Sequence, residues 1–248
     1  MRFLIFLGFL LLGFFVQAQA DQIETDDGTV TMTPILHATA VLEWGDVTIY
    51  MDPYGGADRF EGFKPPDIIC ITHVHGDHLN KETLSGLDVS NARLYAPQSV
   101  INELGPIPFK EIRLLNNGQE NTYQGVTVRA EPMYNLPNDD TARHPKGWGN
   151  AYVLTIGNKR FYFSGDTEDI PEMRELTDID YAFVCMNLPY TMTVEQAADA
   201  VIEFKPKAVY PFHFRGQDGF SDVNLFKKLV NEGDSDIEVR LRDWYPEK

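Results

Sequence analysis

The sequence predicts a four-layer α/β sandwich built from two similar halves that face each other. A two-residue hairpin turn occurs at Gly45-Asp46 and again at Gly157-Asn158, each between two runs of strand-forming residues. An aspartate ends the second strand of each hairpin, Asp52 in the first and Asp166 in the second. A buried apolar strand follows each hairpin, so the same order recurs after roughly 115 residues. Each half is therefore expected to be a sheet with helices on its outer face.

The elements of the two halves can be placed from hydrophobic periodicity and from turn signals. After a polar start over residues 21–28, the first half should contain strands at 38–44, 47–51, 68–71, 94–96 and 111–115 and helices at 79–87 and 98–104. The second half should contain strands at 122–130, 152–156, 160–163, 181–186, 208–212 and 237–241 and an amphipathic helix at 225–231. A capping box of Thr193 and Gln196 should start a further helix that runs through Lys205.

The segment from Glu131 to Asn150 breaks this rhythm. It is rich in prolines and turn residues, contains His144 and Trp148, and shows no periodicity. A structureless connection of this length inside a compact domain is more often a lid or a binding loop than a plain surface loop. We therefore expect it to contribute to a functional site.

The first twenty residues are predicted to be a secretory signal peptide. Arg2 provides a positive start, Phe3 to Val16 is apolar apart from two glycines, and Ala18-Gln19-Ala20 fits a cleavage site. The apolar stretch is shorter than the roughly 20 residues that a membrane-spanning helix needs, although an uncleaved anchor is the alternative. We therefore expect a mature single domain, residues 21–248, that is exported to the periplasm or the extracellular space without stable membrane insertion.

Composition and charge limit the class of partner. Of the 248 residues, 43% are hydrophobic and 23% are charged, which allows a substantial core. The net charge of −16 argues against nucleic-acid binding, because such proteins need basic patches to displace counterions. A small-molecule substrate is the expected partner. Cys70 and Cys185 both lie within apolar runs, which favours buried free thiols over a disulfide.

The densest group of chemically active residues follows the apolar run Ile68 to Ile71. His73, His75, Asp77 and His78 lie within six residues of one another, where a buried strand gives way to a loop. Neutral imidazoles and carboxylates are ligands for zinc or another first-row metal. His73 and His75 can close on one ion, whereas Asp77 and His78 suit a second ion beside it. A polar, solvated loop without metal is the alternative interpretation.

Together with Ser164-Gly165-Asp166-Thr167 and a late His213 at a strand end, the motif His73-x-His75-x-Asp77-His78 resembles the metallo-β-lactamase-fold superfamily. The resemblance covers nearly all of the mature chain. Within the superfamily the chain looks closest to broad-specificity metal-dependent hydrolases, including the ascorbate-6-phosphate lactonase-like and N-acyl-phosphatidylethanolamine phospholipase-like groups. It does not look like the antibiotic-degrading branch.

The resemblance implies a site with two metal ions. His73 and His75 would bind the first ion, and Asp166 would bridge both ions. The second ion would be bound by Asp77, His78 and His213. The ions would most simply be zinc, with iron or manganese as alternatives, and Asp77 or Asp166 would orient the nucleophile and accept its proton.

One position departs from the family pattern. The family has a third histidine for the first ion after the strand that precedes the second hairpin, but this chain has Met133-Tyr134-Asn135 there. The nearby histidine is His144, in the long loop, and we expect it to fold back as the missing ligand. The alternative is that His144 is a surface or substrate-contacting residue and that the first ion is weakly bound or absent.

Other polar and aromatic residues are expected around the site rather than on the metal. His37 and Asp52 are interpreted as supporting or structural residues. Asn187, Tyr190, Tyr134 and Trp148 are candidates for lining the pocket. The sequence thus predicts a metal-dependent hydrolase of a small ester, lactone or phosphodiester. The alternatives are an iron-binding redox enzyme of the same fold and a non-catalytic binding module with a degraded site.

Overall fold

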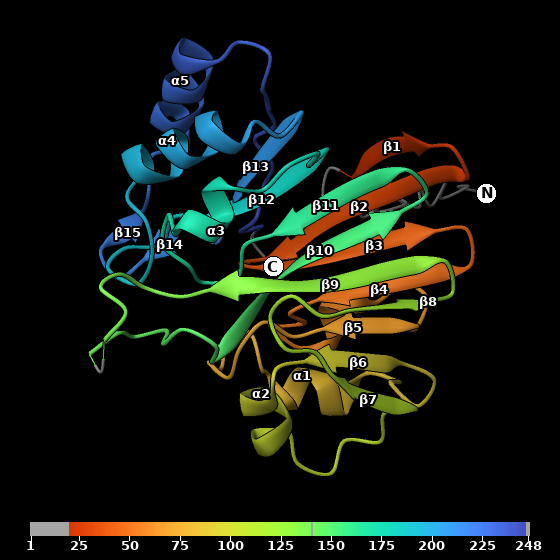
Figure 1. The fold of residues 1–248 in the computed structure, drawn as a ribbon. Coiled ribbons are helices and arrows are strands. Elements are labelled where there is room, and N and C mark those ends of the chain that lie inside the picture. Colours follow the sequence, from red (N-terminus) through yellow and green to blue (C-terminus); the bar gives the residue numbers. More distant parts are fainter. Residues whose placement is uncertain (1–19, 140, 247–248) are drawn as a thin grey trace, which may run out of the picture.

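The computed structural model describes residues 20–139 and 141–246. The predicted signal peptide therefore lies outside the described residues, apart from Ala20 at its end. None of the helices in the described part of the chain has the length and apolar character needed to cross a membrane. Two seven-stranded sheets face each other, with helices on the outside, as the sequence predicts (Figure 1).

The first sheet is formed by the first half of the chain. Its strands follow sequence order from β1 to β7, antiparallel from β1 to β4 and parallel from β4 to β7. The strands are β1 (Asp21–Thr25), β2 (Gly28–Leu36), β3 (Thr39–Trp44), β4 (Val47–Met51), β5 (Ile68–Cys70), β6 (Arg93–Ala96) and β7 (Glu111–Leu114). The helices of this half are a 3-10 turn, η1 (Ala57–Phe60), and the short α1 (Lys81–Gly86) and α2 (Gln98–Glu103).

The second sheet repeats this plan, with four antiparallel strands followed by parallel ones. Its order is β8-β9-β10-β11-β12-β13-β16. The strands are β8 (Glu120–Tyr123), β9 (Val126–Met133), β10 (Gly149–Ile156), β11 (Lys159–Phe163), β12 (Tyr181–Cys185), β13 (Ala208–Phe212) and β16 (Glu238–Val239). The helices are α3 (Pro171–Arg174), α4 (Val194–Phe204) and α5 (Val223–Gly233), and β14 (Arg215–Gly216) pairs with β15 (Gly219–Phe220).

The hydrophobic core occupies the space between the sheets and extends under the helices. The larger cluster joins side chains of both sheets, such as Leu42 and Leu154, and includes Val201 of α4 and Phe226 of α5. A second cluster lies between the other face of the first sheet and α1 and α2. Burying both faces of each sheet explains why β5 and β12 are continuous apolar runs rather than alternating ones. Cys70 and Cys185 are buried free thiols in these two strands, as expected.

The structure contains η1, α3 and the β14–β15 pair, which the sequence did not predict, and it differs from the predicted elements in three further places. The polar start is a β-hairpin, β1 and β2, anchored by the buried Ile23. The strand predicted at 122–130 is a hairpin, because Gln124 and Gly125 both have positive φ and turn the chain between β8 and β9. The irregular segment is shorter than predicted, since β9 continues to Met133 and β10 begins at Gly149. The capping box at Thr193 is present at the start of α4 as predicted.

Candidate metal centre

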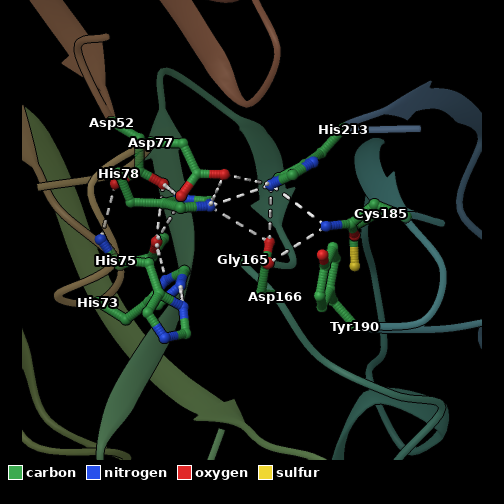
Figure 2. A network of polar contacts seen from close by, with 12 residues as sticks. Asp52, His73, His75, Asp77, His78, Gly165, Asp166, Cys185, Tyr190 and His213 are labelled. Atoms are coloured by element: carbon green, nitrogen blue, oxygen red, sulfur yellow. Dashed lines mark hydrogen bonds and ion pairs between the residues drawn. The ribbon is translucent and has the colours of Figure 1, made fainter. Parts of the chain in front are cut away.

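All seven predicted metal-site side chains meet at one end of the two sheets. They follow the carboxyl ends of strands, where ligand sites in α/β proteins commonly lie. His73, His75, Asp77 and His78 follow β5, Asp166 follows β11, His213 follows β13 and His144 comes from the loop before β10. Figure 2 shows the side chains from the two halves pointing toward one another, with Asp166 between His78 and His213.

The first group contains three histidines. His73 Nε2 lies 3.0 Å from His75 Nδ1, and His144 Nε2 lies 3.2 Å from the same His75 atom. One carboxylate oxygen of Asp166, Oδ2, is 3.7 Å from His144 Nε2. The loop histidine therefore reaches the place where the sequence lacks its expected ligand, and it is buried there with 0% of its surface exposed.

The second group lies on the other side of Asp166. Its Oδ1 atom is 3.3 Å from His78 Nε2 and 3.2 Å from His213 Nε2. Asp77 Oδ2 is 3.5 Å from His213 Nε2 and 3.1 Å from His37 Nε2. The two oxygens of Asp166 thus face different groups, which is the arrangement that a bridging carboxylate requires. His37 lies close enough to Asp77 and His213 for all three to reach one ion.

The hydrogen bonds at the outer side of each ring determine which atoms face inward. His78 Nδ1 donates to Asp52 Oδ2 over 2.8 Å, since a carboxylate accepts only, and His144 Nδ1 donates to Asn135 Oδ1 over 2.8 Å. In the neutral ring each Nε2 is then left with a lone pair that points into the centre. Among the described residues, the buried Asp166 Oδ1 also has no hydrogen-bond donor. Imidazole nitrogens and carboxylate oxygens that converge in this way, with Asp166 Oδ1 lacking a donor in the described part of the chain, fit a cation, so the residues present suit a metal.

The electrostatics differ between the groups: the first favours neutral rings, and the second favours positive charge. Burial lowers the pKa of His144 to about 4 and that of His73 well below its usual value, so these rings are neutral at pH 7, the form that binds metal. Burial also acts to lower the pKa of His78, but Asp166, Asp52 and Asp77 outweigh it and raise that pKa well above its usual value. Burial would raise the pKa of Asp166, yet His213 and His78 hold it well below the usual range. The second group therefore attracts positive charge.

Asp52 supports the centre by contacting Thr72 and the outer nitrogen of the His78 ring. This buried carboxylate accepts hydrogen bonds from the Thr72 backbone N–H (2.8 Å), the Thr72 hydroxyl (2.7 Å) and His78 Nδ1. The Thr72 hydroxyl lies 3.0 Å from His73 Nδ1, so one aspartate orients a histidine of each group. Such partners fix the ring orientation and raise the basicity of the metal-facing nitrogen. The supporting role predicted for Asp52 fits this geometry, whereas the part of Thr72 was missed.

Asn135 has a specific task in this chain. Its side-chain oxygen accepts hydrogen bonds from both the backbone N–H and the ring Nδ1 of His144, each within 2.9 Å. Its amide nitrogen donates to Glu168 Oε1 and to the Tyr190 carbonyl. The residue that replaces the expected histidine therefore holds the loop histidine in place. The sequence by itself shows only that the expected histidine is absent from this position.

Replacing Asn135 by alanine should weaken the first metal group without removing a ligand. Loss of an outer partner of a metal-binding histidine typically lowers metal affinity by about 10- to 100-fold. Competition with a chromophoric chelator measures this affinity. Asn135→Asp, which keeps an acceptor for His144, should recover part of it. Asn102→Ala on the exposed face of α2 is the control, and equal affinities for Asn135→Ala and this control would contradict the assigned task.

The remaining predicted residues divide into two sets. Trp148, Asn187 and Tyr190 lie around the centre: the Trp148 ring is 5.3 Å from that of His75, and Asn187 Nδ2 donates to Asp166 Oδ2 over 3.4 Å. Tyr134 is buried, and its hydroxyl donates to Glu172 Oε2 over 2.8 Å. Tyr245 was missed, although its hydroxyl lies 2.9 Å from His37 Nδ1.

The backbone is strained at three of these positions. His37, Asp52 and His213 have φ values of 61°, 40° and 44°, in the left-handed region that residues other than glycine seldom adopt. Each residue directly follows the last residue of a strand (β2, β4 or β13), and its side chain contacts a residue of the site. Such strain persists only where surrounding contacts hold it, and it clusters at functional sites.

Comparison with known proteins agrees with the fold. A family model described as "Beta-lactamase superfamily domain" matches residues 31–213. The chain is 28% identical over 207 residues to a protein of Pyrococcus abyssi named UPF0173 metal-dependent hydrolase, covering 79% of this chain and 90% of that protein. The chain belongs to the beta-lactamase superfamily, as the resemblance of its motifs implied.

Two solved structures extend the comparison. A protein of Parabacteroides distasonis, described as a candidate metal-dependent hydrolase, has 37% sequence identity and a TM-score of 0.81, and the match covers 92% of this chain and all of that one. Igni18, described as a metallo hydrolase of Ignicoccus hospitalis, has 24% identity and a TM-score of 0.72 over 86% of this chain and 94% of its own. At that identity the second likeness shows the shared fold alone.

Proposed function

We propose that this protein is a metal-dependent hydrolase that binds two zinc ions and cleaves a small ester, lactone or phosphodiester. The observation that carries the proposal is the convergence of seven ligand side chains in two groups with Asp166 between them. The relatives named metal-dependent hydrolases support the reaction class. The proposed groups are His73, His75 and His144 for the first ion and Asp77, His78 and His213 for the second, with Asp166 shared.

Zinc held by these residues would lower the pKa of a coordinated water toward 7 and polarise the substrate oxygen. The chain's own task is to place water and substrate and to accept a proton. Asp77 suits the placing of water because its side chain is 35% exposed, whereas that of Asp166 is 5% exposed. Its Oδ2 faces His37 and His213, while its Oδ1 has no hydrogen-bond partner within the described ranges. We assign to Asp77 Oδ1 the orientation of the attacking water and to Asp166 the shared ligand.

The geometry of His144 also bears on the alternative of a degraded, non-catalytic site. That alternative rested on the missing histidine at position 135, but His144 reaches the first group and Asn135 holds it there. A complete ligand set supports an enzyme. A redox enzyme with iron at the same ligands would use the same side chains, so the identity of the metal decides between the two.

Metal analysis and metal removal test the proposal together. Protein purified without added metal should contain about two equivalents of zinc and hydrolyse members of a panel of esters, lactones and phosphodiesters. Dialysis against a chelator should abolish turnover, and zinc should restore it. Iron in place of zinc would contradict the hydrolase proposal. If no compound of the panel shows metal-dependent turnover, the result favours the alternative of a non-catalytic binding module.

We also propose that the protein is exported and acts outside the cytoplasm. The support is the sequence pattern of residues 1–20. We further propose that the chain is related to the lactonase-like and phospholipase-like groups, on the basis of its sequence motifs. Mass spectrometry of the secreted or periplasmic protein should find an N-terminus at Asp21, and an intact Met1 in the cytoplasm would contradict export.

A further inference from the structure

An arginine lies in the loop that contributes a proposed metal ligand. Arg143 directly precedes His144, and it is exposed although His144 is fully buried. Its guanidinium carbon lies 4.3 Å from the centre of the Tyr190 ring, which is a cation–π contact. The residue next to Arg143 is itself a proposed ligand, since His144 Nε2 lies 3.2 Å from His75 Nδ1.

The Tyr190 ring is a fixed platform for this cation. The Tyr190 backbone N–H donates to the carbonyl of Asn187, whose side chain bonds Asp166, and the Tyr190 carbonyl accepts from Asn135, which holds His144. Arg143 is thus tied to the centre twice, through the chain to His144 and through its stack on Tyr190. Figure 2 shows Tyr190 on the same side of the centre as Asp166 and His213.

The guanidinium of Arg143 has no ion-pair partner within the described part of the protein. Neither an ion pair nor a side-chain hydrogen bond joins its guanidinium to any residue in the ranges 20–139 and 141–246, whereas its loop neighbour Lys146 is ion-paired with Glu172. The chain as a whole has a net charge of −16, so Arg143 places a positive charge on a protein that is negative overall. Arginine stacked on an aromatic ring keeps its fork of donors free for a carboxylate or a phosphate.

We infer that Arg143 and Tyr190 form an anion-binding subsite that selects substrates carrying a carboxylate or phosphate-type group close to the bond that is cleaved. This inference rests on the proposed hydrolase function and names the substrate class of that site. The subsite binds the anionic group of the substrate and leaves the reacting carbonyl to the centre.

Three chromogenic esters test the subsite: 4-nitrophenyl acetate, mono-4-nitrophenyl succinate and the 4-nitrophenyl ester of 3-phosphonopropionate. The wild type should prefer one or both anionic esters, and the preferred ester identifies the anion. Arg143→Gln should lower kcat/KM for that ester by about 10- to 100-fold, the usual worth of a hydrogen bond to a charged group. It should leave acetate turnover within about twofold and metal content unchanged. Arg143→Lys should recover only part of the loss, because it lacks the fork.

Lys227→Gln on α5 removes one exposed positive charge far from the loop and serves as the control for net charge. Equal loss for charged and neutral esters in Arg143→Gln, or loss of metal, would show a structural role and overturn the inference while the proposed function stands. A wild type with the same kcat/KM for the neutral ester and for the anionic esters would also overturn the inference. Absence of metal-dependent turnover of all three esters would overturn the inference, whereas the wider panel of esters, lactones and phosphodiesters decides on the proposed function.

Discussion

Replacing His144 by alanine is expected to remove the first metal ion while the second is retained. The ring offers Nε2 to the first group from a fully buried position, so its loss leaves His73 and His75 with one carboxylate oxygen. Because removal of an outer partner alone costs about 10- to 100-fold, the loss of a ligand should lower first-site affinity by at least about 100-fold. Elemental analysis after dialysis should then find one equivalent instead of two, and hydrolysis should fall with it.

Thr141→Ala changes an exposed residue in the same loop and controls for disturbance of the loop itself. Circular dichroism of both variants would show whether the fold is kept. Two equivalents of metal in His144→Ala would reduce His144 to a loop residue and return the first site to the doubt raised by its position in the sequence.

Replacing Asp52 by alanine should cause the largest loss of folding stability among the site residues. Its carboxylate is 2% exposed and accepts three hydrogen bonds from Thr72 and His78. Removing one partner from a buried charged pair costs about 3 to 5 kcal/mol, because the other partner stays buried without compensation. Urea unfolding of the metal-free protein should show this change in the free energy of unfolding. The metal-free form separates the effect on folding from the effect on metal binding.

The exposed Asp46 provides a matched control, since its ion pair with Lys64 lies at the surface and Asp46→Ala should change stability by less than about 1 kcal/mol. If Asp52→Ala does not fold, Asp52→Asn takes its place. It keeps the side-chain volume and one acceptor, so its loss of folding free energy should be intermediate. A stability of Asp52→Ala equal to that of Asp46→Ala would contradict the role given to the Thr72 and His78 contacts.

Much of the fold and of the site could be predicted from sequence because the signals are local. The motif from His73 to His78 lies within six residues, and the apolar strands and hairpin turns repeat in both halves. Asp166 and His213 follow strands whose ends must meet at one edge of a sheet. The hairpin of β8 and β9 was missed because its turn, Gln124-Gly125, lacks the Asn-Gly or Asp-Gly signal of such turns, although both residues adopt positive φ.

The contacts of the loop that contains His144 could not be predicted from local signals. His144 was assigned by elimination, since an aperiodic segment gives no information about where a side chain points. The part played by Asn135 depends on four hydrogen bonds to residues 9 to 55 positions away in the sequence. Such contacts depend on the folded shape, so neither a propensity nor a spacing rule predicts them. The likeness to metal-dependent hydrolases was visible from the motif, whereas Arg143 gained significance only through its stack on Tyr190.

The division of the centre between the two halves has a consequence for how this protein matures. Four of the seven proposed ligands come from the first half and three come from the second, so neither half alone presents a complete set. Ions that bind the finished site but not the open chain add their binding free energy to that of folding. Metal uptake would then be the last step of assembly, and a loaded centre would report that the two sheets have docked in register.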